Sequence, residues 1–249
     1  MFLITAFAVY LFFENKLTMH SKTCLLIIAR NELDNIKLVY KRVQEISLQH
    51  GLDVLYIDGD SSDGSIEFFQ AQRIEYIQQA YPGRGGAIRT GFELAGYKSF
   101  IVYSPDGNEN IEDIPIFLSK LEAGADLVIA SRMMKGAWNE EDGQALKMRK
   151  WANNAFNFIA NMAFNRSVYV TDSINGYRAI TSKALEAIHL TAFDYTIEYQ
   201  MTMRAMKKRL RIEEFPTVEG NRVYGATGAP SIPTGIAFVK RFIKECMGR

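Results

Sequence analysis

The sequence predicts an α/β fold in which a mainly parallel β-sheet is flanked by helices. From Thr23 onward, short apolar runs alternate with helical patterns, an order that is typical of βαβ units. Hydrophobic residues make up 48% of the 249 residues, which is enough to bury a sizeable core in one domain with at most a small appendage. Polar turns follow the apolar runs. Because ligands bind outside the carboxyl ends of the strands in open α/β sheets, we expect the functional site at these turns.

The first half of the chain predicts strands and helices in alternation. Cys24–Ile28 is expected to be a buried strand, because its apolar residues run without a polar interruption. Asn35–Leu48 should form the next helix, since Ile36, Val39 and Val43 fall on one face. Further strands are expected at Val54–Ile57, Ile74–Ile77, Phe100–Tyr103 and Leu127–Ala130, and further helices at Ser65–Gln72, Ala87–Ala95 and Ile111–Leu121.

The second half changes character. Residues 131–147 predict a long polar loop, of the kind that often covers an active site. In the helix expected at Met148–Phe164, a stripe that includes Trp151, Phe158 and Met162 should pack against the rest of the domain. A helix at Thr196–Lys208, a strand at Ile212–Val218 and a terminal helix near Gly235–Met247 complete the chain.

The terminal helix carries an apolar stripe beside basic residues. Ile236, Val239 and Ile243 share a face, with Lys240 and Lys244 next to it. This pattern is typical of a helix lying in a membrane interface. It is equally typical of a helix packed on its own domain, which is the interpretation we favour.

The start of the chain is apolar but short. Residues 1–13 fall below the roughly 20 residues that a helix needs to cross a bilayer, so we expect no spanning helix. A secretory signal is poorly supported, because no basic region precedes the apolar run. We therefore expect a leader without an assigned role over residues 1–22, the main domain over 23–230 and an amphipathic helix over 231–249. A peripheral membrane contact stays open.

Composition excludes several classes of protein. Lys and Arg number 29 against 28 Asp and Glu, a net charge of +1, so the chain lacks the basic excess of a general nucleic-acid binder. Cys24 and Cys246 lie at opposite ends and form no spaced motif. This excludes a disulfide framework and a structural zinc site, and it favours a reducing, cytoplasmic location.

Polar turns at the predicted strand ends carry the candidate chemistry. Asp106 with Asn108 could hold a hard divalent cation, although the same residue types also make ordinary turns. Asp58, Asp60 and Asp63 could accept hydrogen bonds from a ribose or a nucleobase, or could simply cap the next helix. The glycine-rich turn at residues 81–86 could let the backbone approach a phosphate, but it matches neither a Walker A motif nor the dinucleotide fingerprint.

Four arginines of the second half lie in or beside loops, and guanidinium groups are suited to paired recognition of phosphate oxygens. They are Arg132, Arg149, Arg178 and Arg222. Together they favour an anionic ligand.

The order of these turns resembles a known family. Leu25–Glu32, Tyr56–Ser65, Gly83–Gly91 and Ser104–Asn108 are similar to the successive motifs of family-2 glycosyltransferases, which have the Rossmann-like GT-A fold. The continuation through Ala130–Arg132, Asp172–Arg178 and Asn221–Gly225 looks most like the branch of dolichyl-phosphate mannose synthase and other polyprenyl-phosphate sugar transferases. The resemblance covers residues 23 to 247.

This resemblance implies an inverting enzyme that uses a UDP- or GDP-linked sugar, Mg²⁺ or Mn²⁺, and a polyprenyl (dolichyl-type) phosphate acceptor at the membrane. A transferase to a saccharide hydroxyl of the cell envelope is the alternative, with Asp172 or Glu198 as the general base. A protein that binds sugar nucleotides without catalysis is a third possibility.

The resemblance also implies roles for individual residues. The donor side comprises Ala29, Arg30, Glu32, Asp58, Pro105, Asp106, Arg132 and Arg222; the metal ligands are Ser104, Asp106 and Asn108; the acceptor side comprises Arg149, Asn153 and Arg178; and the catalytic set is Asp106, Arg149, Asp172 and Arg178. The chain departs from the family pattern at three positions. Ser104 replaces the first carboxylate of the metal motif, Gly59 replaces an aspartate, and Gly228 stands where a lysine is expected.

Overall fold

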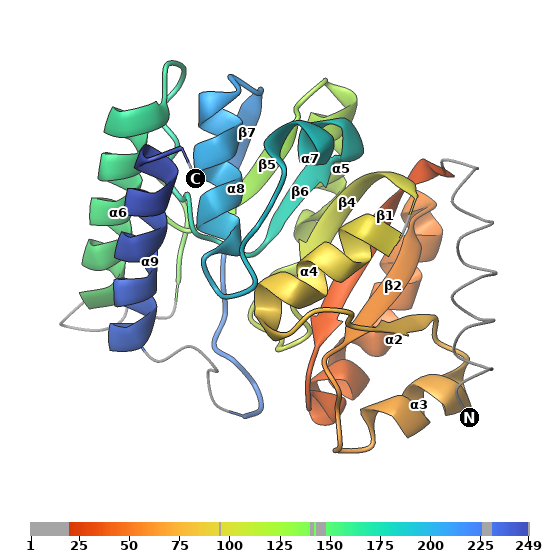
Figure 1. Cartoon of the computed structure of the whole chain (residues 1–249). Helices are drawn as coiled ribbons and strands as arrows, with labels where there is room; N and C mark the ends of the chain where they lie inside the picture. Colours follow the sequence, from red (N-terminus) through yellow and green to blue (C-terminus); the bar gives the residue numbers. More distant parts are fainter. Residues whose placement is uncertain (1–19, 95, 140–141, 143–147, 226–230, 249) are drawn as a thin grey trace.

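The computed structural model describes residues 20–94, 96–139, 142, 148–225 and 231–248. They form one seven-stranded sheet, of order β3-β2-β1-β4-β6-β5-β7, with helices on both faces (Figure 1). The strands are β1 (His20–Ala29), β2 (Asp53–Asp58), β3 (Tyr76–Gln78), β4 (Tyr97–Tyr103), β5 (Leu127–Ser131), β6 (Arg178–Thr181) and β7 (Ile212–Pro216). The main helices are α2 (Leu33–His50), α3 (Ser65–Gln72), α4 (Gly83–Leu94), α5 (Ile114–Glu122), α6 (Met148–Phe164), α7 (Ser182–Ile188), α8 (Ile197–Lys207) and α9 (Ser231–Cys246). The predicted α/β class is confirmed.

β1 lies inside the sheet and is buried on both faces, which explains its uninterrupted apolar run. Leu25 and Ile27 belong to the core beneath α2, α3 and α5, whereas Leu26 and Ile28 belong to the core beneath α4. β2 and β4 pair with β1 in parallel on either side. The carboxyl ends of these strands therefore meet at one edge of the sheet.

β6 was not predicted from the sequence. It is only four residues long, begins with Arg178, and runs antiparallel between β4 and β5. β6 therefore lies in the middle of the sheet, and β5 and β7 lie on the side of β6 away from β4. The segment 172–177 leads into β6 and is thereby held near the end of β5, where Ala130 N donates to Tyr177 O at 3.1 Å.

The expected packing face of α6 was wrong. Trp151, Phe158 and Met162 are 57%, 54% and 66% exposed, and the helix instead buries Asn157 and Asn161. The two amides turn inward because the chain at residues 170–173 needs hydrogen-bond partners.

These amide contacts lie beside apolar packing by Phe156, Ala160 and Phe164 on the buried side of α6. Asn157 accepts from Ser173 N at 2.8 Å and donates to Thr171 O at 2.5 Å. Asn161 accepts from Val170 N at 2.9 Å and donates to Val170 O at 2.8 Å. The pairing fixes the approach to β6.

α9 packs on α6 and α8, as the favoured interpretation of its pattern expected. Phe238 is buried, and its ring lies 5.4 Å from that of Phe156. Ile236, Val239 and Ile243 nevertheless stay about half exposed. α6 and α9 lie side by side at the left of Figure 1, so their exposed apolar residues belong to one end of the molecule.

Within the described residues, no helix is long and apolar enough to cross a bilayer. The apolar run at residues 1–13, most of the leader, and Gly228 lie outside the residues that the structure describes. The division into 1–22, 23–230 and 231–249 stays a prediction.

Candidate active site

A pocket of about 860 Å³ opens at the carboxyl ends of β1, β4 and β5. It lies where the sequence placed the ligand site. Of the residues expected there, Ala29, Arg30, Glu32, Ser104, Pro105, Asp106, Asn108, Arg132 and Arg222 line it. Asp58, Arg149, Asn153, Asp172 and Arg178 are not among its lining residues.

The turn after β4 presents two oxygens without partners. Asp106 Oδ1 and Asn108 Oδ1 are buried and have no hydrogen-bond partner within the described chain. The turn is tight, because Gly107 adopts a φ of 79°, a conformation that favours glycine. Burial raises the pKa of Asp106, and the attraction of Arg222 offsets this only in part. The unpartnered oxygen of this carboxylate is therefore available to a cation or a proton.

The donor atoms of this turn fit a hard divalent cation. Carboxylate and amide oxygens are the ligands that Mg²⁺ and Mn²⁺ prefer. No group of three or more His, Cys, Asp or Glu side chains in the described ranges is arranged to hold a metal by itself. A cation at Asp106 and Asn108 would therefore take the rest of its ligands from water and from a bound anion, as Mg²⁺ commonly does.

Arg222 joins both sides of the pocket. Its Nη1 donates to Asp106 Oδ2 at 3.0 Å, and its Nη2 pairs with Glu32 Oε1. The segment that carries Arg222 is tied to the β4 turn, because Val223 N donates to Asp106 O at 3.2 Å and Gly220 N to Asn108 O at 2.7 Å. The backbone thus holds this guanidinium directly beside the unpartnered oxygens.

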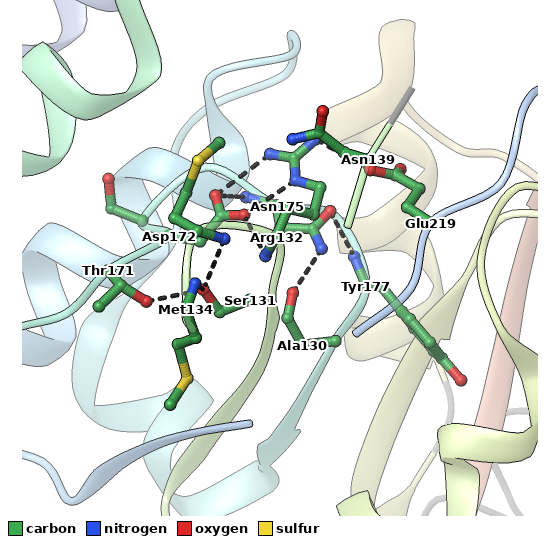
Figure 2. Close-up of polar contacts among 12 residues, drawn as sticks. Ala130, Ser131, Arg132, Met134, Asn139, Thr171, Asp172, Asn175, Tyr177 and Glu219 are labelled. Atoms are coloured by element: carbon green, nitrogen blue, oxygen red, sulfur yellow. Dashed lines mark hydrogen bonds and ion pairs between the residues drawn. The ribbon is translucent and has the colours of Figure 1, made fainter. Parts of the chain in front are cut away.

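Arg132 lies between two carboxylates (Figure 2). Its Nε and Nη2 donate to the two oxygens of Asp172 at 2.8 and 3.1 Å, and its Nη1 lies 3.5 Å from Glu219 Oε2. Asp172 is fully buried and also accepts from the backbone N–H groups of Arg132 and Asn175. Burial alone would raise the pKa of Asp172, but Arg132 outweighs it and holds the pKa below its usual range.

The comparison with protein families identifies the chain. Residues 24–188 match the profile of glycosyl transferase family 2, which spans more than half of the sequence. The chain belongs to glycosyl transferase family 2.

Relatives share low sequence identity but long alignments. The polyprenol monophosphomannose synthase of Mycolicibacterium smegmatis is 27% identical over 83% of this chain and 80% of that protein. The dolichol-phosphate mannosyltransferase of Pyrococcus furiosus is 22% identical over 82% of this chain, which spans 58% of that protein.

Solved structures share the fold of this glycosyltransferase. Glucosyl-3-phosphoglycerate synthase of Mycobacterium tuberculosis, in complex with Mn²⁺, UDP and glucosyl-3-phosphoglycerate, superposes with a TM-score of 0.69 at 15% identity, covering 91% of this chain and 80% of that one. The same enzyme with Mn²⁺ and UDP-glucose gives a TM-score of 0.70. The family-2 enzyme described here therefore has the GT-A architecture.

Arg178 does not face the pocket of this glycosyltransferase. It is fully buried, and its guanidinium donates to Asn175 O at 2.7 Å, Glu198 O at 2.8 Å and Thr202 Oγ1 at 3.0 Å. Burial lowers its pKa to about 10, against the attraction of Glu198 and Asp172, so it stays charged at neutral pH. The expectation that Arg178 contacts an acceptor phosphate is not met by this geometry, because protein carbonyls already occupy its donors.

The two carboxylates considered as general bases are ion-paired. Asp172 is held by Arg132, and Glu198 Oε1 accepts from Arg84 Nε at 2.7 Å with the Glu198 side chain 4% exposed. A paired, buried carboxylate is a poor proton acceptor, because taking up a proton would leave its arginine uncompensated. The structure therefore gives both carboxylates a structural role, Asp172 in the loop before β6 and Glu198 in a buried ion pair of α8.

Of the remaining expected residues, only Asp63 lines the pocket. Arg149 and Asn153 are in the first turns of α6, where Arg149 is exposed. Asp58 is buried at the end of β2 and accepts from Ser61 N at 3.0 Å, with its Oδ1 unpartnered inside the described structure. Asp63 does line the pocket, but it caps the chain by accepting from Leu33 N at 2.9 Å and from Ser65 N at 3.0 Å.

Sequence analysis missed several charged residues of the pocket. Arg84, Glu109 and Glu219 all line it. Arg84 belongs to the glycine-rich turn that was quoted for its backbone, and Glu109 follows Asn108 directly. Their side chains could have been found by asking which charges flank each polar turn, whereas Glu219 is brought in only by the pairing of β7 with β5.

Proposed function

We propose that this glycosyltransferase moves a hexose from a UDP- or GDP-linked sugar to a polyprenyl phosphate, with inversion at the anomeric carbon. The observation that carries the proposal is the pair of unpartnered oxygens on Asp106 and Asn108, next to Arg222 and Arg132 in one pocket. The names of the similar proteins, which are polyprenol and dolichol-phosphate mannose transferases, support this choice of acceptor.

The donor would lie along the edge formed by β1 and β4. The nucleobase and ribose would contact residues at the end of β1 and just after it, namely Ala29, Arg30 and Glu32. Asp58, at the end of the neighbouring strand β2, would lie beside them. Pro105 and Asp106 follow β4 and would lie beside the diphosphate. Solved structures with the same fold contain Mn²⁺ with UDP or UDP-glucose, which supports a nucleotide diphosphate at this edge of the sheet.

Mg²⁺ or Mn²⁺ held by Asp106 and Asn108, with Ser104 at the edge of the turn, would supply Lewis-acid stabilisation of the leaving diphosphate. Arg222 and Arg132 would add positive charge as the glycosidic bond breaks and its electron pair moves onto the nucleoside diphosphate. In the same step an oxygen of the acceptor phosphate forms the new bond to the anomeric carbon. One displacement inverts the configuration.

A phosphate acceptor explains why the pocket needs no general base. A phosphate monoester has a second pKa of about 6, so its oxygen is already anionic at neutral pH. The ion pairs of Asp172 and Glu198 agree with this, because neither carboxylate is placed to remove a proton. Orientation of the acceptor then contributes much of the rate.

The acceptor would approach from the end of the molecule formed by α6 and α9. Arg149 and Asn153, at the start of α6, would hold its phosphate. The exposed Trp151 and Phe158 of α6, and Ile243 of α9, would contact the membrane in which a polyprenyl chain lies. We therefore propose a peripheral position at the cytoplasmic face of the membrane.

Transfer from a panel of UDP- and GDP-sugars tests this function, with Mn²⁺ present and either a polyprenyl phosphate in detergent or a saccharide as acceptor. We expect an organic-extractable glycolipid, whose formation stops in Asp106→Ala. Glycosylation of the saccharide without any glycolipid would contradict the lipid acceptor. Nucleotide-sugar binding without turnover, unchanged in Asp106→Ala, would identify a binding protein instead of an enzyme.

A further inference from the structure

The turn after β4 has one carboxylate where the resembled metal motif has two. Ser104 occupies the first position of that motif, and Asp106 the second. A short hydroxyl side chain is a weaker cation ligand than a carboxylate, because it carries no charge. The pocket, however, contains a further carboxylate that the motif does not predict.

Glu109 lies against the residue that lacks the carboxylate. Its Oε2 accepts from the backbone N–H of Ser104 at 2.7 Å, which returns the side chain to the beginning of the turn. Glu109 lines the pocket and is only 9% exposed. No hydrogen-bond donor approaches its Oε1 within the described ranges. One carboxylate oxygen is therefore anchored, and the other is available inside the pocket.

Glu109 also lacks an ion pair of the kind that Asp106, Glu32 and Glu219 make with arginines. Arg222 pairs with Asp106 and Glu32, and Arg132 pairs with Glu219. Glu109 makes no close ion pair with any residue that the structure describes, and Arg84 of the same pocket attracts its charge without contacting it. A buried carboxylate without a cation in contact is costly, because its charge has lost the stabilisation of water.

We propose that Glu109 supplies the second carboxylate of the cation site, in place of the one missing at Ser104, and holds Mg²⁺ or Mn²⁺ together with Asp106 and Asn108. Asp106 Oδ1 and Asn108 Oδ1 are the unpartnered oxygens of the same turn, so three hard oxygen donors from three side chains would face one ion. Diphosphate oxygens and water would complete its shell. The inference rests on the proposed function only in taking a diphosphate as the anion.

The competing role for Glu109 is a structural one, in which the side chain only caps the Ser104 N–H group. A glutamine in its place would keep that cap, because its amide oxygen can accept the same hydrogen bond. A cap would thus tolerate Glu109→Gln, whereas a cation ligand would not. The substitution separates the two roles without changing the shape of the side chain.

The test measures Mn²⁺ binding, with no sugar or acceptor present, from the loss of the free-ion electron paramagnetic resonance signal, with and without UDP and GDP. We expect Glu109→Gln to weaken Mn²⁺ binding by at least about tenfold, the loss typical for groups that support a metal site. Glu112→Gln is the matched control, because Glu112 is exposed and pairs with Arg42 outside the pocket. It should bind Mn²⁺ as the unaltered protein does.

A rescue variant sharpens the result. In Ser104→Asp/Glu109→Gln, a carboxylate returns to the first position of the turn, and we expect Mn²⁺ affinity to recover at least partly. Binding by Glu109→Gln within twofold of the unaltered protein would overturn the proposal, as would a protein that binds no Mn²⁺ at all. Glycolipid formation in either case would leave the proposed function intact.

A crystal of the unaltered protein grown with MnCl₂ and UDP gives a second measurement that does not depend on how the variants fold. An anomalous manganese peak within coordination distance of Asp106 and Glu109 would support the proposal. A manganese ion bound by Asp106 with neither carboxylate oxygen of Glu109 within coordination distance would overturn it.

Discussion

Replacing Arg178 by methionine should destabilise the fold and leave the affinity for the acceptor unchanged. The family resemblance implies that this arginine is on the acceptor side. In the structure Arg178 begins β6, and its buried guanidinium donates to protein oxygens, including Glu198 O of α8. Methionine has a similar length and no donors. The variant therefore removes the hydrogen bonds and the charge without opening a large cavity.

The size of the effect follows from the acceptors that Arg178 leaves behind. The hydroxyl of Thr202 lies 2.9 Å from Ser173 O and 3.1 Å from Glu198 O, and its single proton can serve one of these two carbonyls at a time. Asn175 O has no other donor in the described part of the chain. At least one unpaired buried carbonyl and the lost charge-assisted bonds together cost about 2–4 kcal/mol of the free energy of unfolding. For a protein of this size, that lowers the melting temperature by about 4–16 °C.

Urea denaturation and thermal melting measure the stability, and acceptor titrations well below the melting temperature measure KM. We expect a lower denaturation midpoint with KM for polyprenyl phosphate within about twofold of the unaltered enzyme. Arg166→Met is the control, because Arg166 is exposed at the end of α6, and it should change stability by less than about 0.5 kcal/mol. A variant of Arg178 with normal stability and a strongly raised acceptor KM would refute the reasoning and place this arginine on the acceptor phosphate.

Further outcomes follow from the ion pairs of the pocket. Asp106→Asn should abolish Mn²⁺-dependent transfer while the protein stays folded, which activity assays and circular dichroism would check. Arg222→Ala should weaken nucleoside diphosphate binding by about tenfold or more, the loss of one charge-assisted hydrogen bond, and calorimetry showing unchanged affinity would contradict this. The depressed pKa of Asp172 means that its stabilising contribution is present above the unfolded pKa of about 3.9 and disappears as pH falls through the lower folded value. The Asp172→Asn variant should therefore be less stable than the unaltered protein at neutral pH. Its free energy of unfolding, measured by urea denaturation, should also change less as the pH is lowered.

The strands and helices of the first half could be predicted because the pattern of apolar residues in each segment matches the faces that the fold buries. The run at Cys24–Ile28 is apolar on both faces since both faces of β1 are covered. β6 could not be predicted in this way, because four residues that begin with an arginine carry no recognisable period. Its place in the sheet is decided by pairing with β4 and β5, which are distant in sequence.

The packing of α6 shows the limit of reasoning from hydrophobic stripes. The stripe with Trp151, Phe158 and Met162 faces outward, whereas the inward face combines apolar residues with asparagines whose amides bond to the chain before β6. Burial of a polar side chain depends on partners that a single helix does not reveal. The same reason explains Arg178: a motif gives the residue type, but the tertiary contacts decide which way the guanidinium points.

The electrostatics of the pocket couple the entry of a cation to the entry of a diphosphate. Arg222 and Arg132 are the arginines expected to meet the diphosphate, and both are paired with carboxylates: Arg222 with Glu32 and Asp106, and Arg132 with Asp172 and Glu219. A diphosphate that pairs with Arg222 would weaken the ion pair between Arg222 and Asp106. The Asp106 carboxylate would then be stabilised only if another positive charge bound to it. A cation bound alone would conversely stand beside the positive charge of Arg222, and the diphosphate relieves that repulsion. On the proposed function, each ligand would therefore raise the affinity for the other, and because such coupling is reciprocal, the same factor would apply in both directions.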